Sequence, residues 1–308
     1  MSTPVATPSV VRSPVAVSLP DASRLAAFAK LSKLRIGFMA VVAVAVGYSL
    51  GVEAGWNWPV FVLALAGVGL GAVASSVLNQ CIEVASDARM QRTANRPLPS
   101  GQVSLTEGWT YGLACSLLST AILLLFVNPL TGCLTLITTV AYVAIYTPLK
   151  RYSPLCTVLG AIPGAMPLVL GWTAAGAPLN MPALSLFILL FVWQFPHFLA
   201  IAWIYQDQYR GAGLKMLPAD GHPTSVGLIA VGYAAALIPC SLLLRWWGLA
   251  GTVYATAALL LGLWYLVDTI RFARDPQVGT ARRLLKTSLI YLPAVLLVLT
   301  ADHLWRLN

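Results

Sequence analysis

The stretch that decides how this chain folds is NQCIEVASDARMQRTANRPLPSG, from Asn79 to Gly101. It follows one long apolar run and precedes another, in a chain of which only 9% of the residues are charged. An ordinary soluble domain has about 25% charged residues. Two acids and three arginines within this one stretch therefore need a specific explanation.

The composition indicates a membrane protein. The chain has 308 residues and is 58% hydrophobic, and its apolar runs have the length of about 20 residues that crosses a bilayer as a helix. We expect an all-α integral membrane protein in which residues 31–308 form one transmembrane domain, preceded by a disordered cytoplasmic tail at 1–30. Nine transmembrane helices are expected, at 36–53, 58–82, 107–126, 130–149, 155–175, 182–204, 225–244, 250–270 and 285–303.

The basic residues predict the orientation in the membrane. With these nine spans, 17 of the 19 basic residues lie on the side of the N-terminus, and only Arg245 and Arg306 lie on the other. The positive-inside rule then predicts a cytoplasmic N-terminus and a C-terminus on the opposite side. The net charge of +9 is thus a topology signal, and we expect the lipid bilayer, rather than a nucleic acid, as partner. The prolines of the tail fit an amphipathic transit peptide poorly, which favours a cell inner membrane over that of a mitochondrion.

The acids of the opening stretch share one face of a helix. Asn79, Glu83 and Asp87 are four residues apart, so each is turned only about 40° from the last. Oxygens stacked in this way suit Mg²⁺, which takes one or two carboxylates and completes its shell with water and phosphate. Arg92 and Arg96 follow, and guanidinium groups bind phosphate with paired hydrogen bonds. A solvated loop would explain the arginines, but not polar groups at the end of an apolar helix, so we expect a diphosphate site.

Two further stretches carry polar residues at helix ends. WQFPHFLAIAWIYQDQYRGAGLKMLP places His197 inside an apolar segment, where it is either a hydrogen-bonded interhelical residue or a functional one. Asp207, farther along, is a candidate second metal carboxylate. YTPLKR puts Lys150 at another helix end, where topology and phosphate contact explain it equally well.

These stretches together resemble the UbiA-type intramembrane prenyltransferases, and most narrowly their protoheme IX farnesyltransferase group. The first is similar to that group's N-x-x-x-[DE]-x-x-x-D-x-x-M-x-R-T-x-x-R-P-L, and YTPLKR, WQFPHF and AGLKMLP resemble three more of its stretches. The residues that match the first motif are Asn79, Glu83, Asp87, Met90, Arg92, Thr93, Arg96, Pro97 and Leu98.

The resemblance implies a reaction and a set of site residues. A farnesyl group would pass from farnesyl diphosphate to a vinyl group of heme b, giving heme O for heme A biosynthesis, with Mg²⁺ as cofactor and a heme A synthase as a possible partner. It implies metal ligation by Asn79, Glu83, Asp87 and Asp207, catalysis by Asn79, Glu83, Asp87, Arg92 and Arg96, and substrate contacts from His197, Lys150, Tyr146 and Tyr209.

One departure and several alternatives stay open. The family has an acid directly before the tyrosine of the second cluster, where this chain has Gln208, with Asp207 one residue earlier. One residue is a rotation of about 100° on a helix, which puts the second metal carboxylate in doubt. The alternatives are an aromatic or quinone-precursor acceptor, a transporter of an anionic substrate, and an inactive homologue.

Overall fold

The computed structural model describes residues 21–53, 55–217 and 222–307, and in these ranges the chain is helical with no strand. The nine expected spans are confirmed as helices long and apolar enough to cross a membrane. In chain order these are α2 (Leu34–Gly51), α3 (Trp58–Asp87), α4 (Leu105–Phe126), a composite fourth span (Pro129–Leu149), α7 (Cys156–Ala174), α8 (Met181–Ile204), α10 (Pro223–Trp246), α11 (Thr252–Arg274) and α12 (Val278–Leu307).

Two helices run well beyond the expected ends. α3 was expected to stop at residue 82 but continues to Asp87, and α12 begins at Val278 rather than near residue 285. Hydropathy marks only the part of a helix that lies in hydrocarbon, whereas hydrogen bonding continues past it into polar surroundings. The extension of α3 places Asn79, Glu83 and Asp87 on one continuous helix.

The expected disordered tail needs correction where it is described. Residues 21–31 form the helix α1 (Asp21–Leu31), which packs Ala27 and Leu31 against Cys81 of α3. The apolar residues of this segment gain burial only when α3 is present, so the segment read alone resembled a polar tail. The remainder of the expected tail, residues 1–20, lies outside the described residues.

The fourth span changes its helical winding. It runs as α5 (Pro129–Val140), a π-helical segment η1 (Ala141–Tyr146) and the short α6 (Thr147–Leu149). The backbone N–H of Thr147 bonds the carbonyl of Tyr142, five residues back, and its hydroxyl donates to the same carbonyl at 2.8 Å. Pro148 follows and has no N–H to donate. The wider turn of the π-helical segment sets the directions in which the side chains of Tyr146 and Lys150 point.

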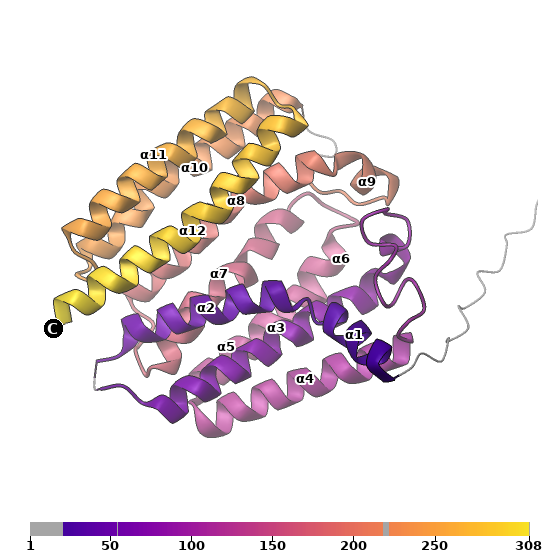
Figure 1. Ribbon diagram of the computed structural model, residues 1–308, viewed down its shortest axis with the longest axis horizontal. Coiled ribbons are helices and arrows are strands. Elements are labelled where there is room, and N and C mark those ends of the chain that lie inside the picture. Colours follow the sequence, from indigo (N-terminus) through magenta and orange to yellow (C-terminus); the bar gives the residue numbers. More distant parts are fainter. Residues whose placement is uncertain (1–20, 54, 218–221, 308) are drawn as a thin grey trace, which may run out of the picture.

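The spans run side by side, with α10, α11 and α12 grouped together (Figure 1). α7 lies at the centre of the bundle, since 67% of the residues in its most apolar stretch are buried. It meets α2 almost backbone to backbone, because a Cβ added at Gly47 would lie 2.0 Å from the carbonyl oxygen of Leu168. In Figure 1, α1 and α9 (Gln206–Gly211) lie at one end of the bundle and the C-terminus at the other.

Candidate active site

A cavity of about 490 Å³ opens at the end of the bundle that carries α9. Its polar lining comes from five separate parts of the chain: the end of α3 and the segment after it, the end of the fourth span, the α1–α2 turn, the start of α7, and α9. The charged side chains that line it are four basic and two acidic: Lys33, Arg92, Arg96, Lys150, Glu83 and Asp87. The lining is therefore net positive and suited to a polyanion.

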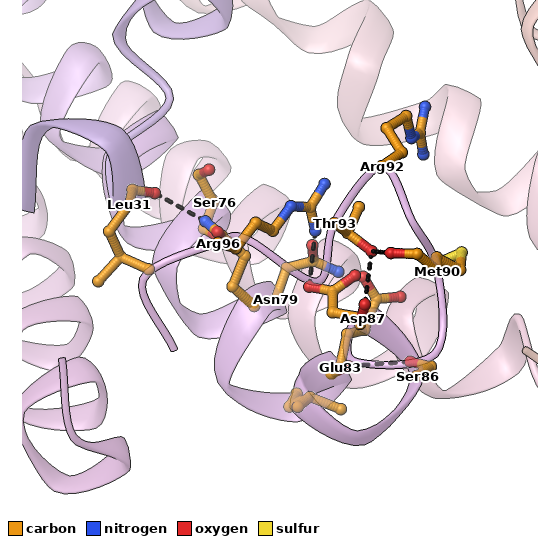
Figure 2. A network of polar contacts seen from close by, with 12 residues as sticks. Leu31, Ser76, Asn79, Glu83, Ser86, Asp87, Met90, Arg92, Thr93 and Arg96 are labelled. Atoms are coloured by element: carbon orange, nitrogen blue, oxygen red, sulfur yellow. Dashed lines mark hydrogen bonds and ion pairs between the residues drawn. The ribbon is translucent and has the colours of Figure 1, made fainter. Parts of the chain in front are cut away.

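Each acid of the cavity has a basic partner. Glu83 Oε1 lies 2.7 Å from Lys150 Nζ, and Asp87 Oδ2 lies 2.7 Å from Arg96 Nη1. Both carboxylates are buried on the same face of α3. Figure 2 shows Arg96 reaching back over the end of the helix to Asp87. The spacing of four residues thus brings the two acids together as the sequence predicted.

Asn79 lies one turn deeper and is 2% exposed. Its Nδ2 donates to Thr147 Oγ1 at 2.8 Å, in the same turn that follows the π-helical segment. Asn79 therefore ties α3 to the fourth span and holds Lys150 opposite Glu83.

The segment after α3 folds back over the helix end. Thr93 is fully buried, and its hydroxyl donates to the backbone carbonyl of Asp87 at 2.8 Å (Figure 2). This bond satisfies one of the carbonyls that a helix end leaves without a partner. It also fixes the loop that carries Arg92 and Arg96.

Arg92 turns away from the α3 carboxylates and toward α9 (Figure 2). Its Nη2 donates to the Tyr209 hydroxyl at 3.1 Å, and its guanidinium lies 4.5 Å from the centre of the Tyr205 ring. Its backbone N–H donates to Gln208 Oε1 at 3.2 Å. Gln208, where the resembled family has an acid, thus holds the arginine loop in place.

The structure does not bring Asp207 into the cavity. Its side chain is 88% exposed and pairs with Arg210 at 3.3 Å. The rotation of one residue along α9 turns this carboxylate toward solvent and gives the inward positions to Gln208 and Tyr209. This placement corrects the assignment of Asp207 as a metal ligand.

Lys33 is a site residue that the sequence reasoning counted only as a topology signal. It lies between α1 and α2, and its backbone has φ 48° and ψ 51°. Residues other than glycine seldom adopt this left-handed conformation. Burial, and then the charges of Arg96 and Lys150, lower the pKa of Lys33 to about 7. Nothing in the sequence could separate it from the other basic residues, because its direction depends on that one turn.

His197 lies on α8 and is not one of the residues that line the cavity. Its Nδ1 is 2.8 Å from Ser288 Oγ of α12, and its ring stacks on Trp193 with 5.1 Å between centres. The adjacent Phe198 and Ile201 line the cavity, which becomes apolar on this side. The site therefore combines the charged side chains around the end of α3 with an apolar wall on α8.

The donor set fits a hard divalent cation only with help from a ligand. Across the ranges that the structure describes, no three His, Cys, Asp or Glu side chains gather into a metal site. Glu83 and Asp87 supply two carboxylates, and Mg²⁺ bound by one or two carboxylates takes the rest of its shell from water and substrate phosphate. The basic side chains beside them suit that same phosphate.

The family comparison covers most of the chain. The model of the UbiA prenyltransferase family matches residues 40–291. A protoheme IX farnesyltransferase from Koribacter versatilis is 41% identical over 96% of this chain and 99% of its own length. One from Solibacter usitatus is 39% identical over 90% of this chain and 98% of its own. The human mitochondrial protoheme IX farnesyltransferase is 36% identical over 88% of this chain and 61% of its own.

Solved structures share the fold. A digeranylgeranylglyceryl phosphate synthase superposes with a TM-score of 0.78 at 17% identity, over 92% of this chain and 99% of its own. A UbiA homologue from Archaeoglobus fulgidus, bound to GPP and Mg²⁺, superposes with a TM-score of 0.65 at 18% identity, over 89% of this chain and 99% of its own.

Proposed function

Because the chain belongs to the UbiA prenyltransferase family, we propose that it transfers a farnesyl group from farnesyl diphosphate to a vinyl group of heme b. The products are heme O and diphosphate. One observation carries the proposal: a single cavity has four basic and two acidic side chains, mostly on and around the end of α3, and an apolar wall formed by Phe198, Ile201 and Ala202 of α8. Its close relatives bear the name of this activity.

The charged part of the cavity binds the diphosphate. In the present structure Lys150 and Arg96 neutralise Glu83 and Asp87. When the diphosphate enters, these two cations turn to its oxygens, as Arg92 does from the opposite wall. The freed carboxylates of Glu83 and Asp87, with Asn79, would hold Mg²⁺, which would neutralise negative charge on the leaving group.

The reaction then follows from leaving-group stabilisation. The bond between the first farnesyl carbon and oxygen breaks, and the diphosphate keeps the electron pair, which Arg92, Arg96 and Lys150 stabilise. The vinyl electrons of heme b form the new carbon–carbon bond to the allylic cation. Water adds to the cation left beside the porphyrin and loses a proton. Apolar residues of the α8 wall, such as Phe198 and Ile201, keep water from the allylic cation before the vinyl group attacks.

We propose that the heme lies against the α8 wall of the cavity, where the His197 ring is 5.7 Å from that of Phe198. A histidine inside an apolar span is costly and usually functional, and its neighbours Phe198 and Ile201 line the cavity. We assign His197 to the heme iron, and Tyr146 and Tyr209 to the rim between the two substrates. Replacement of His197 by alanine is expected to weaken hemin binding and to leave the affinity for farnesyl diphosphate unchanged.

Turnover in liposomes tests the proposal. The assay supplies hemin, a reductant, farnesyl diphosphate and Mg²⁺, and detects heme O by its mass and chromatographic retention. Product is expected from the native chain and is lost with Asp87→Ala or with a chelator. If farnesyl diphosphate binds but no heme product forms, the acceptor is a different one, such as an aromatic or quinone-precursor molecule. Membership of a family of transferases argues against a transporter of an anionic substrate.

The same proposal includes the setting in the cell. The chain is a multi-pass membrane protein, and the distribution of basic residues supports a cell inner membrane with the N-terminus in the cytoplasm. The cavity then opens to the cytoplasm, where farnesyl diphosphate, a charged metabolite, can reach it. A heme A synthase is the partner that would consume the apolar product.

A further inference from the structure

Ser288 of α12 faces His197 of α8 inside the bundle. The two side chains meet through Ser288 Oγ and His197 Nδ1 at 2.8 Å. Ser288 is fully buried, and its backbone carbonyl accepts a hydrogen bond from Trp193 Nε1 at 3.1 Å. Trp193 in turn stacks on the His197 ring with 24° between the planes. The imidazole is therefore held along one edge and on one face.

The position of one proton decides what the imidazole can do. A serine hydroxyl has a single hydrogen to donate. Ser288 donates it to the backbone carbonyl of Leu285 at 2.7 Å. In that arrangement Ser288 Oγ accepts toward His197, and the hydrogen of the 2.8 Å contact is carried by His197 Nδ1. A neutral imidazole with its hydrogen on Nδ1 has a free electron pair on Nε2.

A free Nε2 pair is what iron requires of a histidine. Histidines that bind a metal donate their other ring N–H to a fixed acceptor, which sets the tautomer, orients the ring and makes the ligand more basic. His197 is part-buried, and the centre of its ring lies 5.7 Å from that of Phe198, a residue of the cavity wall. The edge of the ring opposite Ser288 is then the edge that can meet a planar, iron-bearing substrate.

We propose that Ser288 is a positioning residue that holds His197 as the Nδ1–H tautomer and so presents Nε2 to the iron of the heme substrate. This inference rests on the proposed function, because it takes the acceptor to be a heme that His197 contacts. It adds a residue from α12, a helix to which none of the sequence motifs assigned a role.

The chain offers a matched control. Ser241 of α10 is also fully buried and also donates to the carbonyl three residues back, at 2.7 Å. Its own carbonyl accepts from an aromatic side chain, the Tyr254 hydroxyl, at 3.0 Å. Ser241→Ala therefore reproduces the loss of a buried serine hydroxyl without touching His197.

The test is hemin binding by the full chain in nanodiscs, with the iron–histidine stretch of the ferrous complex measured by resonance Raman spectroscopy. Ser288→Ala is expected to weaken hemin binding about tenfold, the usual scale for loss of such a partner, and to lower the stretching frequency. Ser288→Thr, which keeps a hydroxyl, should restore both. Ser241→Ala should change neither, and farnesyl diphosphate binding with a normal melting temperature shows that each variant is folded.

The outcomes separate this inference from the proposed function. If His197→Ala loses the iron–histidine band but Ser288→Ala keeps both the native band and the native affinity, Ser288 has no positioning role. If His197→Ala binds hemin as the native chain does, the role of His197 itself is overturned. If Ser241→Ala has the same effect as Ser288→Ala, the change comes from lost packing, and the inference also fails.

Discussion

At the scale of single residues, the two ion pairs of the cavity stabilise the folded protein, in addition to the role we propose for them in substrate binding. Glu83 and Lys150 are buried together, so removal of one leaves the other without compensation. Breaking a buried pair in this way costs about 3–5 kcal/mol, whereas replacing both members can be nearly neutral. Stability and catalysis can therefore be separated by substitution.

Lys150→Met is expected to lower the melting temperature clearly, because Glu83 keeps a buried charge without a partner. The double variant Glu83→Gln with Lys150→Met should recover most of that loss and still turn over farnesyl diphosphate at least about a hundredfold more slowly, the scale for loss of a group that stabilises charge. Thermal melts and the turnover assay measure the two effects. A double variant with native activity would show that the pair is only structural.

Lys33 predicts a pH dependence of binding. Its pKa of about 7 means that the amine is mostly neutral above that pH. A bound diphosphate favours the charged form and raises the pKa, so binding takes up a proton above pH 7. The affinity for farnesyl diphosphate should therefore fall between pH 7 and pH 9, by up to about tenfold per pH unit.

Calorimetric titration in two buffers of different ionisation enthalpy measures both the affinity and the proton uptake. Lys33→Arg should bind without this pH dependence, because a guanidinium does not titrate in the range. Lys33→Met should also lose it and bind more weakly throughout. An unchanged pH profile in Lys33→Met would assign the proton to another group.

Replacement by asparagine is expected to affect turnover very differently at Asp207 and at Asp87. Asp207→Asn should leave the Mg²⁺ dependence of turnover within about twofold of native, as exposed positions usually do, because its side chain is 88% exposed. Asp87→Asn should abolish turnover at the same Mg²⁺ concentration. A metal titration of the reaction rate checks both. A large increase in the Mg²⁺ requirement of Asp207→Asn would return that residue to the metal site.

At the scale of elements, α2 and α7, which give Ile36, Thr157 and Gly160 to the cavity lining, pack in close contact with each other. Without a hydrophobic driving force between helices in lipid, small residues that allow close packing take its place. Gly47 and Gly171 face each other's helix, and a Cβ on either would lie 2.0 Å from a backbone oxygen. Backbone cannot swing aside as a flexible side chain can.

Gly47→Ala is expected to destabilise the protein by about 1–3 kcal/mol, the usual cost of overpacking. Gly232→Ala on α10 is the control, since a Cβ there has no heavy atom within 4 Å, and alanine favours a helix over glycine. Melting in the same detergent compares them. Equal melting temperatures for the two variants would mean that α2 and α7 move apart at little cost.

At the scale of the whole molecule, the part of the chain that the structure describes crosses the membrane an odd number of times. Its nine spans place α1 and the C-terminal end of α12 at opposite ends of the bundle (Figure 1). With the positive-inside rule, a tag before α1 should be protected in intact spheroplasts and a tag after Leu307 should be cleaved by added protease. Protection of both tags would require an even number of crossings and would overturn the topology.

The sequence by itself determined the class of the fold, the number of spans and the main motif. These properties are local: a hydrophobic run has the length of a bilayer whatever it packs against, and a spacing of four residues puts Asn79, Glu83 and Asp87 on one face of any helix. The ends of the spans were not determined, because a helix can continue past its apolar residues. α3 does so up to Asp87, and α12 begins in this way at Val278.

The tertiary structure decided which of the other polar residues belong to the cavity. Lys33 lines the cavity because its backbone adopts the left-handed conformation, whereas the side chain of Asp207 on α9 points to solvent. Ser288 contacts His197 although the two residues are 91 positions apart in sequence. Each of these depends on the direction of a side chain relative to a partner distant in sequence. Such directions are set by helix packing, which no local pattern of residues encodes.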